Sequence, residues 1–159
     1  MDKNKLLEAY KLGYNELQNT LREFPLEMFD FKPSPDKWSV KEIIIHMTDS
    51  EINGYLRCRK IIAENGSIIT PYNQNAWTDK LHYSSRSIDT NLELFRLIRI
   101  VNYSLLINLP DETWNNYVTH PESGKITLKD YLKIYVDHVD IHTKQMTRNF
   151  DAWKNNHNT

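Results

Sequence analysis

The sequence has one cysteine and only four glycines among its 159 residues. The lone Cys58 allows no disulfide within the chain, which is typical of a reducing compartment. Few glycines favour helices over a sandwich or a barrel, whose tight turns use glycine. No apolar run is long enough to cross a membrane, and the first residues are charged and amphipathic rather than signal-like. We therefore expect a helical, cytoplasmic protein.

The sequence also lacks an excess of charge of one sign and the common catalytic signatures. Its formal net charge is −1, so neither nucleic acid nor an anionic membrane is an expected partner. The patterns HExxH, GxSxG, GxGxxG and the phosphate-binding loop do not occur. Any catalytic chemistry must therefore come from another arrangement of side chains.

Apolar residues recur at the spacing of amphipathic helices in four stretches. Ser39 and Glu42 form the Ser-x-x-Glu capping box of the second helix. The expected helices cover residues 3–24, 39–64, 87–109 and 127–152, with a tail at 154–159 that we expect to fray. Residues 66–86 form a long crossover with room for a short helix near 73–77, and residues 114–126 resemble a small hairpin. This order predicts an all-α fold, a four-helix bundle in one domain over residues 1–159.

Two histidines in the last helix carry the strongest chemical signal. His138 and His142 are four residues apart, which places them on one face of a helix. Two imidazoles one turn apart can hold one metal ion, but catalytic zinc sites usually have three protein ligands and an open position. Because metal sites in bundles use side chains from facing helices, His46 of the second helix is the natural third ligand.

Polar residues follow His46 along the second helix. Asp49 is a candidate catalytic base or a group that orients a ligand, with a solvated helix carboxylate as the alternative. Asn53 and Arg57 are candidates to bind a carboxylate-bearing substrate, with an ordinary surface or inter-helix hydrogen bond as the alternative. Tyr135, one turn before His138, lines a substrate pocket or packs in the core. Cys58 lies among apolar neighbours, which predicts an inert buried thiol rather than a nucleophile.

An ordered set of motifs resembles the DinB-like superfamily, and within it the YfiT-like branch. The set begins with residues 38–50, WSVKEIIIHMTDS, continues with Ile69-Thr70-Pro71-Tyr72 and Trp77, and then His120-Pro121 with Gly124. It closes with the helix that contains Tyr135, His138 and His142. The resemblance spans roughly residues 33–146, which is most of the chain.

The resemblance implies an up-down-down-up four-helix bundle, often a homodimer, with a zinc or nickel ion on three histidines. Carried over by position, the ligands are His46, His138 and His142. The sequence departs from the branch on the last helix, where Ile141 and Gln145 stand in place of a denser histidine cluster. This departure bears on the substrate more than on the metal. If a homodimer forms, Phe150 and Trp153 are possible contact residues.

A metal on three neutral histidines keeps its charge and acts as a Lewis acid. It lowers the pKa of bound water, which leads to hydrolysis, or ionises a bound thiol, which leads to thiol transfer. Relatives in the resembling family are thiol S-transferases, so we expect an enzyme that activates a small-molecule thiol against an electrophile. A metal-dependent hydrolase of a small amide or ester is the first alternative. The second is a non-catalytic metal-binding stress or scaffold protein.

Overall fold

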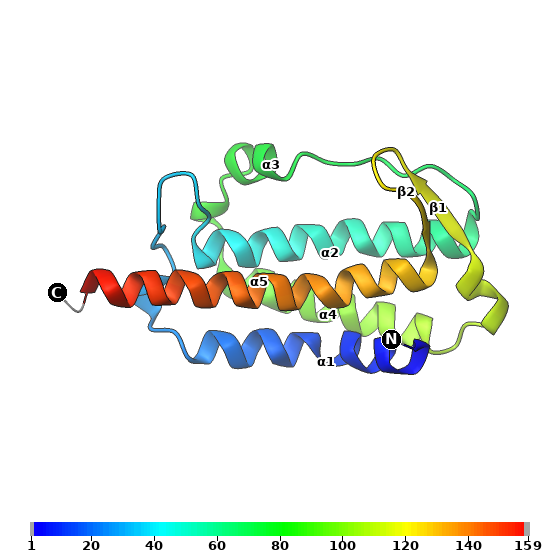
Figure 1. Ribbon diagram of the computed structural model, residues 1–159, viewed down its shortest axis with the longest axis horizontal. Coiled ribbons are helices and arrows are strands. Elements are labelled where there is room, and N and C mark those ends of the chain that lie inside the picture. Colours follow the sequence, from blue (N-terminus) through cyan, green and yellow to red (C-terminus); the bar gives the residue numbers. More distant parts are fainter. Residues whose placement is uncertain (1, 158–159) are drawn as a thin grey trace.

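The computed structural model describes residues 2–157 and shows a bundle of long helices (Figure 1). The long helices are α1 (Lys3–Arg22), α2 (Val40–Ala63), α4 (Ile88–Leu106) and α5 (Leu128–His157). A short helix α3 (Gln74–Lys80) and a hairpin of β1 (Tyr117–His120) and β2 (Gly124–Thr127) lie between them, together with short 3-10 helices at Leu26–Met28, Tyr83–Ser85 and Asp111–Asn115. The predicted all-α bundle is confirmed, and the hairpin lies where the sequence placed it. Within the described residues, none of the helices has the length and apolar character needed to cross a membrane.

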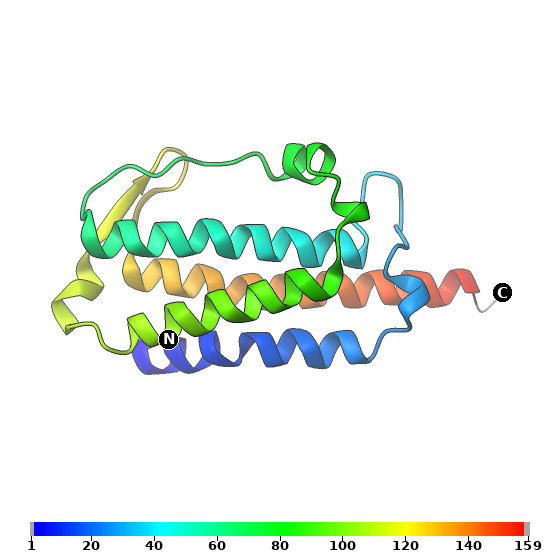
Figure 2. The ribbon, with the colours of Figure 1, turned by 180° about the vertical axis from the view of Figure 1, so that it is seen from behind.

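The helices follow the up-down-down-up topology. Helix α1 packs beside α5 and α4, while α2 packs beside α4 and α5 (Figures 1 and 2). Helices α2 and α4 are consecutive long helices, and the long crossover at residues 64–87 lets them run in the same direction. The groove between α2 and α5 therefore lies opposite the groove between α1 and α4.

Side-chain caps explain where the helices begin. Ser39 Oγ accepts a hydrogen bond from the Glu42 amide at 3.2 Å, and the Glu42 carboxylate accepts one from the Ser39 amide at 2.9 Å. This is the capping box that the sequence predicts. Thr127 and Asp130 form the equivalent pair at the start of α5, where Thr127 Oγ1 accepts from the Asp130 amide at 3.2 Å.

The end of α5 corrects one prediction. The helix continues to His157, so fraying from Lys154 onward is wrong for the part of the tail that the structure describes. The His157 ring stacks on Trp153 with centroids 4.4 Å apart, and Lys154 forms an ion pair with Asp151 at 2.7 Å. These contacts between residues three and four apart support the last turn. Residues 158–159 lie outside the described part.

The start of the crossover is attached to the hairpin. Near the hairpin, the Ile69 amide donates to the Thr119 carbonyl at 3.1 Å, and the Thr119 amide donates to the Ser67 carbonyl at 2.9 Å. Further along, the rings of Tyr72 and Trp77, both within the crossover, pack against each other with centroids 4.5 Å apart at the start of α3. The short helix expected near residues 73–77 is confirmed, and it extends to Lys80.

A buried polar layer divides the bundle core into two apolar clusters. Arg99 of α4 contacts the Glu51 carboxylate at 3.1 Å and donates twice to the Tyr10 carbonyl, at 3.1 and 2.7 Å. Tyr10 and Asn102 are buried beside this ion pair. A Cβ atom at Gly13 would lie 2.7 Å from Arg99 Nη2, so glycine makes room for the guanidinium. Helical periodicity does not reveal this layer.

Candidate metal centre

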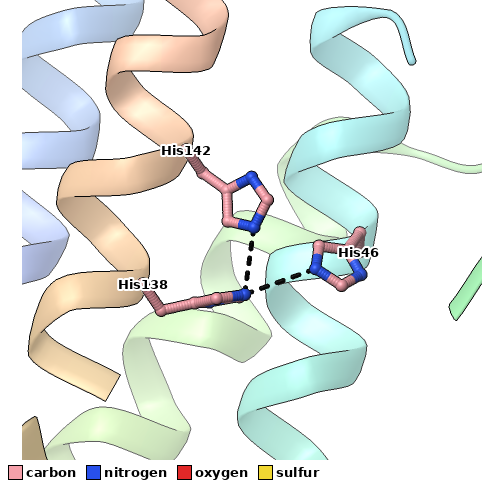
Figure 3. Close-up of side chains that lie close together, drawn as sticks. All are labelled: His46, His138 and His142. Atoms are coloured by element: carbon pink, nitrogen blue, oxygen red, sulfur yellow. Dashed lines mark hydrogen bonds between the residues drawn. The ribbon is translucent and has the colours of Figure 1, made fainter. Parts of the chain in front are cut away.

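Three histidines from two helices converge in the groove between α2 and α5 (Figure 3). His138 Nε2 lies 3.3 Å from His46 Nε2 and 3.0 Å from His142 Nε2. One ring nitrogen from each of the three residues lies within 4.8 Å of those of the other two. The structure thus brings together the three residues that the sequence proposed as metal ligands.

The local sequence explains this convergence. On α5 the four-residue spacing puts His138 and His142 on one face, and α2 supplies His46 from the facing helix. The Trp38 ring lies 4.7 Å from the His46 ring and covers it at the start of α2. His46 is only 2% exposed and His142 is 8% exposed. Trp38 belongs to the motif that resembles the family, but its place over His46 is visible only in the structure.

Burial keeps these imidazoles neutral. It lowers the pKa of His46 to about 3, and the nearby His142 lowers it further. Burial is also the main reason that the pKa of His138 is lowered, with His142 and His46 adding to the effect. The pKa of His142 is lowered by burial as well, against the raising effect of Gln145. Neutral imidazole is the form that binds a metal ion.

Gln145 fixes the orientation of one ring, a contact that the sequence did not reveal. Its Oε1 lies 2.9 Å from His142 Nδ1. A proton on Nδ1 that is donated to Gln145 leaves Nε2 free to face the other two histidines. Gln145 stands at a position where the resembling branch often has histidine, so an amide here supports a ligand instead of adding one.

A cavity of about 430 Å³ opens onto the histidines. Besides the three rings, its walls include Trp38, Lys37 and Gln145, together with Gln74 and Asn75 of α3. The short helix of the crossover therefore supplies part of the wall, as its place above α2 in Figure 1 suggests. Polar amide and ammonium groups facing buried ring nitrogens form a site for a small polar molecule.

Asp49 lies away from this cavity and binds the crossover. Its Oδ2 accepts a hydrogen bond from the Tyr83 hydroxyl at 2.6 Å and contacts Arg86 Nη1 at 3.2 Å. Tyr83 is fully buried. Burial and the neighbouring Asp49 carboxylate raise the pKa of Tyr83 far above its usual range, so the hydroxyl keeps its proton and donates. Asp49 thus attaches the end of the crossover to α2, one turn from His46.

The other predicted site residues also have partners within the described chain. Asn53 donates to the Asp49 carbonyl at 2.9 Å, and Arg57 donates to the Thr70 carbonyl of the crossover at 3.3 Å. Tyr135 is 3% exposed and donates to the Ser50 carbonyl at 3.2 Å. Within the described chain, none of these residues lines the cavity at the histidines. Burial raises the pKa of Cys58 to about 12, which agrees with an inert thiol.

The histidine cluster fits a divalent metal ion. In a tetrahedral zinc site with Zn–N distances of about 2.0–2.1 Å, two nitrogens lie about 3.3 Å apart. The two Nε2 separations of 3.3 and 3.0 Å are close to this value. The Nε2 atoms of His46 and His138 face each other, and the described residues offer no hydrogen-bond partner to the buried Nδ1 atoms of these two rings.

Comparisons with known proteins agree with the fold and show the family. The family model of the DinB superfamily matches residues 9–146. A protein of Oceanobacillus iheyensis named "Putative metal-dependent hydrolase" is 30% identical over 131 residues, which cover 82% of this chain and 76% of that one. A Bacillus cereus protein of the same name is 26% identical over 133 residues, covering 84% of this chain and 76% of that one.

Two solved structures have the same fold. The structure of YfiT from Bacillus subtilis, described as "a probable metal-dependent hydrolase with an unusual four-helix bundle topology", superposes with a TM-score of 0.86 and 23% identity. The superposition covers 94% of this chain and 87% of the YfiT chain. A mycothiol-dependent maleylpyruvate isomerase superposes with a TM-score of 0.71 and 13% identity, covering 92% of this chain and 61% of that chain.

The fold and the three-histidine cluster define a four-helix-bundle protein with a candidate metal centre. The chain belongs to the DinB superfamily.

Proposed function

We propose that the protein is a metal-dependent enzyme that transfers a small-molecule thiol to an electrophile. His46, His138 and His142 would hold zinc or nickel. The observation that carries this proposal is the convergence of one ring nitrogen from each of three histidines, two of them buried, at the wall of a cavity of about 430 Å³. The metal would supply Lewis acidity, which ionises a bound thiol near neutral pH.

The surrounding residues would orient and shield the reacting groups. Gln145 holds the His142 ring, and Trp38 covers His46 and keeps water from its outer side. Lys37 and the amides of Gln74 and Asn75 face the same cavity and would bind a carboxylate or an amide of the thiol or of its acceptor. The cavity is small, and its lining combines these polar groups with the apolar surfaces of Trp38 and Ile141.

The four other predicted site residues take supporting roles in this proposal. Asp49 and Arg57 bind the crossover, and Asn53 binds the Asp49 carbonyl. They would therefore position the wall that carries α3 rather than touch the substrate. Tyr135 would set the spacing of α5 from α2 beside His138, through its bond to Ser50.

The second candidate is a metal-dependent hydrolase that uses metal-bound hydroxide on a small amide or ester. The names of the curated relatives favour it. The mycothiol dependence stated for the isomerase with a similar fold favours the thiol reaction instead. The two candidates differ in whether turnover requires an added thiol.

The resembling family also implies a homodimer, which we propose for this chain. Phe150 packs against Phe24 of its own chain with ring centroids 5.0 Å apart, and Trp153 stacks on His157. The exposed apolar side chains of α4, among them Leu97 and Val101, are therefore better candidates for the contact. Light scattering should give twice the chain mass, and a Leu97→Lys/Val101→Lys variant should give the mass of one chain.

The test of function uses zinc-loaded protein with 1-chloro-2,4-dinitrobenzene and, in parallel, cysteine, mycothiol or bacillithiol. We expect thiol conjugation above the uncatalysed rate with at least one thiol and loss of that activity in His46→Ala. Hydrolysis of 4-nitrophenyl acetate without thiol, equally dependent on His46, would favour the hydrolase. If neither reaction depends on His46, the enzyme proposal is wrong.

A further inference from the structure

A second cavity lies on the opposite side of the bundle from the histidines. It has a volume of about 330 Å³ and lies in the groove between α1 and α4. Typical small-molecule sites have volumes of about 300–1,000 Å³, so this one has room for a ring or two with a polar substituent. No part of the proposed thiol or hydrolase reaction uses it.

The charged side chains that line this cavity are all basic within the described chain. Lys11, Arg96 and Arg99 line the cavity, and no carboxylate does so within the described chain. Lys11 and Arg96 form ion pairs with Glu8 at 3.7 Å and Glu93 at 2.7 Å, respectively. The Lys11 pair is long and exposed and contributes little, so the anionic group of a ligand can compete for Lys11. Arg96 is held by two bonds to Glu93, at 2.8 and 2.7 Å, and can contact a ligand through its remaining N–H groups.

Arg99 gives the cavity a buried, fixed donor. It is 3% exposed, and its four recorded hydrogen bonds go to Tyr10, Glu51 and Tyr135. A guanidinium has five N–H groups, so one N–H of Nη2 has no recorded acceptor. Nη2 packs directly against Gly13, because a Cβ at that position would lie 2.7 Å away. Arg99 also lines the cavity, so its floor includes a buried guanidinium that these bonds hold in place.

The remaining walls are aromatic and apolar. Tyr14 of α1 and Tyr103 of α4 line the cavity together with Ile100. Lys11 Nζ lies 5.7 Å from the centre of the Tyr103 ring, so cation and aromatic surface adjoin. Tyrosine faces next to cationic groups suit a planar, apolar body that carries one negative group. We propose that this cavity binds a small aromatic carboxylate.

The test uses 1-naphthoate as the probe, titrated into the full chain and followed by amide chemical shifts. We expect saturable shifts centred on residues 10–15 and 96–104. The neutral analogue 1-naphthalenemethanol should bind about tenfold more weakly, because it lacks the charge-assisted hydrogen bonds. The His46→Ala variant should bind 1-naphthoate as the wild type does, so this result is independent of the metal proposal.

Matched variants identify the residues. Lys11→Gln/Arg96→Gln should weaken binding about tenfold, whereas Lys5→Gln/Arg22→Gln removes the same charges from exposed positions of α1 and should leave it unchanged. Ser104→Trp fills the cavity from its exposed rim and should abolish binding. Shifts centred on the histidine cavity would overturn the proposal. So would no saturable shift, equal affinity for the neutral analogue, or equal affinity in the two charge variants.

Discussion

Gln145 is the residue whose contact decides how His142 faces the other two histidines. Its amide oxygen lies 2.9 Å from Nδ1, on the side of the ring away from the cluster. Residues that hold a ligating histidine from behind set its tautomer and its ring angle. The sequence marked position 145 as a departure from the resembling branch but could not say what the glutamine does there. Only the turn of the helix and the side-chain conformation reveal the contact.

Replacing Gln145 by leucine should weaken metal binding. Leucine has a similar size but no hydrogen-bond acceptor, so the His142 ring is free to rotate or to change tautomer. Loss of such a contact typically lowers metal affinity about 10–100-fold. Chelator competition with zinc measures the change. Gln18→Leu, on α1 and far from the site, is the control and should bind zinc as the wild type does. Equal affinity in Gln145→Leu and wild type would contradict this role.

The buried histidines should make the metal-free protein acid-sensitive. The pKa of His46 is about 3 in the folded chain, against an ordinary value of 6.5 that the unfolded chain regains. Between these values the unfolded chain binds a proton that the folded chain does not, so stability is full above pH 6.5 and falls as the pH drops toward 3. Within this pH range, each such group lowers the free energy of unfolding by about 1.4 kcal/mol for every unit by which the pH falls.

Urea unfolding of the metal-free protein at pH 7, 6 and 5 tests this expectation. The free energy of unfolding should decrease at each step in the wild type. His46→Gln removes one of the titrating groups and should show a smaller decrease. The same pH dependence in both proteins would mean that His46 is not held neutral in the fold.

At the scale of helices, Gly54 permits the close packing of α2 on α5. A Cβ atom at this position would lie 2.5 Å from Cζ of Tyr135. Glycine inside a helix usually costs about 1 kcal/mol relative to alanine. Here the glycine is required by the ring that lies against it, one turn before His138.

Gly54→Ala should therefore destabilise the protein by about 1–3 kcal/mol, although a better helix former is introduced. Denaturant unfolding gives the free energy. In a Tyr135→Leu background the steric conflict is removed, and the same substitution should become neutral or stabilising. Stabilisation by Gly54→Ala in the wild-type background would show that the ring can move away.

Helices and the hairpin were predictable because their signals are local. The Ser39–Glu42 capping box, the apolar stripes and the turn at Gly124 each act within a few residues of one another. The end of α5 was misjudged, since charged and polar residues in a last turn do not reveal the stacking of His157 on Trp153. The polar layer of Arg99 and Glu51 was not predictable, because its partners come from separate helices.

At the scale of the whole molecule, this layer connects all the long helices. Arg99 of α4 contacts Tyr10 of α1, Glu51 of α2 and the Tyr135 carbonyl of α5. Removing one partner of a buried ion pair leaves an uncompensated charge, which typically costs about 3–5 kcal/mol. Arg99→Met should show a loss of this size by denaturant unfolding.

Glu51→Leu/Arg99→Met removes both charges and is the control. It should recover much of the lost stability, because apolar replacement of both partners is often neutral. A loss below about 1 kcal/mol in Arg99→Met would place the carboxylate in contact with water. That result would contradict the burial of Glu51 at 1% exposure.

The candidate metal centre was predictable in part. The four-residue spacing of His138 and His142, with the facing-helix argument for His46, predicted that these three residues share one site. The structure brings their side chains together. The walls of the cavity were not predictable. Gln74 and Asn75 reach it through the path of a crossover, and Asp49 turns to Tyr83 and Arg86 rather than to the histidines.

Metal content per chain tests the central claim most directly. The protein is purified without a histidine tag, beside His46→Ala, His142→Ala and the control His157→Ala at the exposed end of α5. We predict about one zinc or nickel ion per chain in the wild type and the control, and none in the other two variants. A wild type that holds no metal after reconstitution with zinc and with nickel would contradict the account.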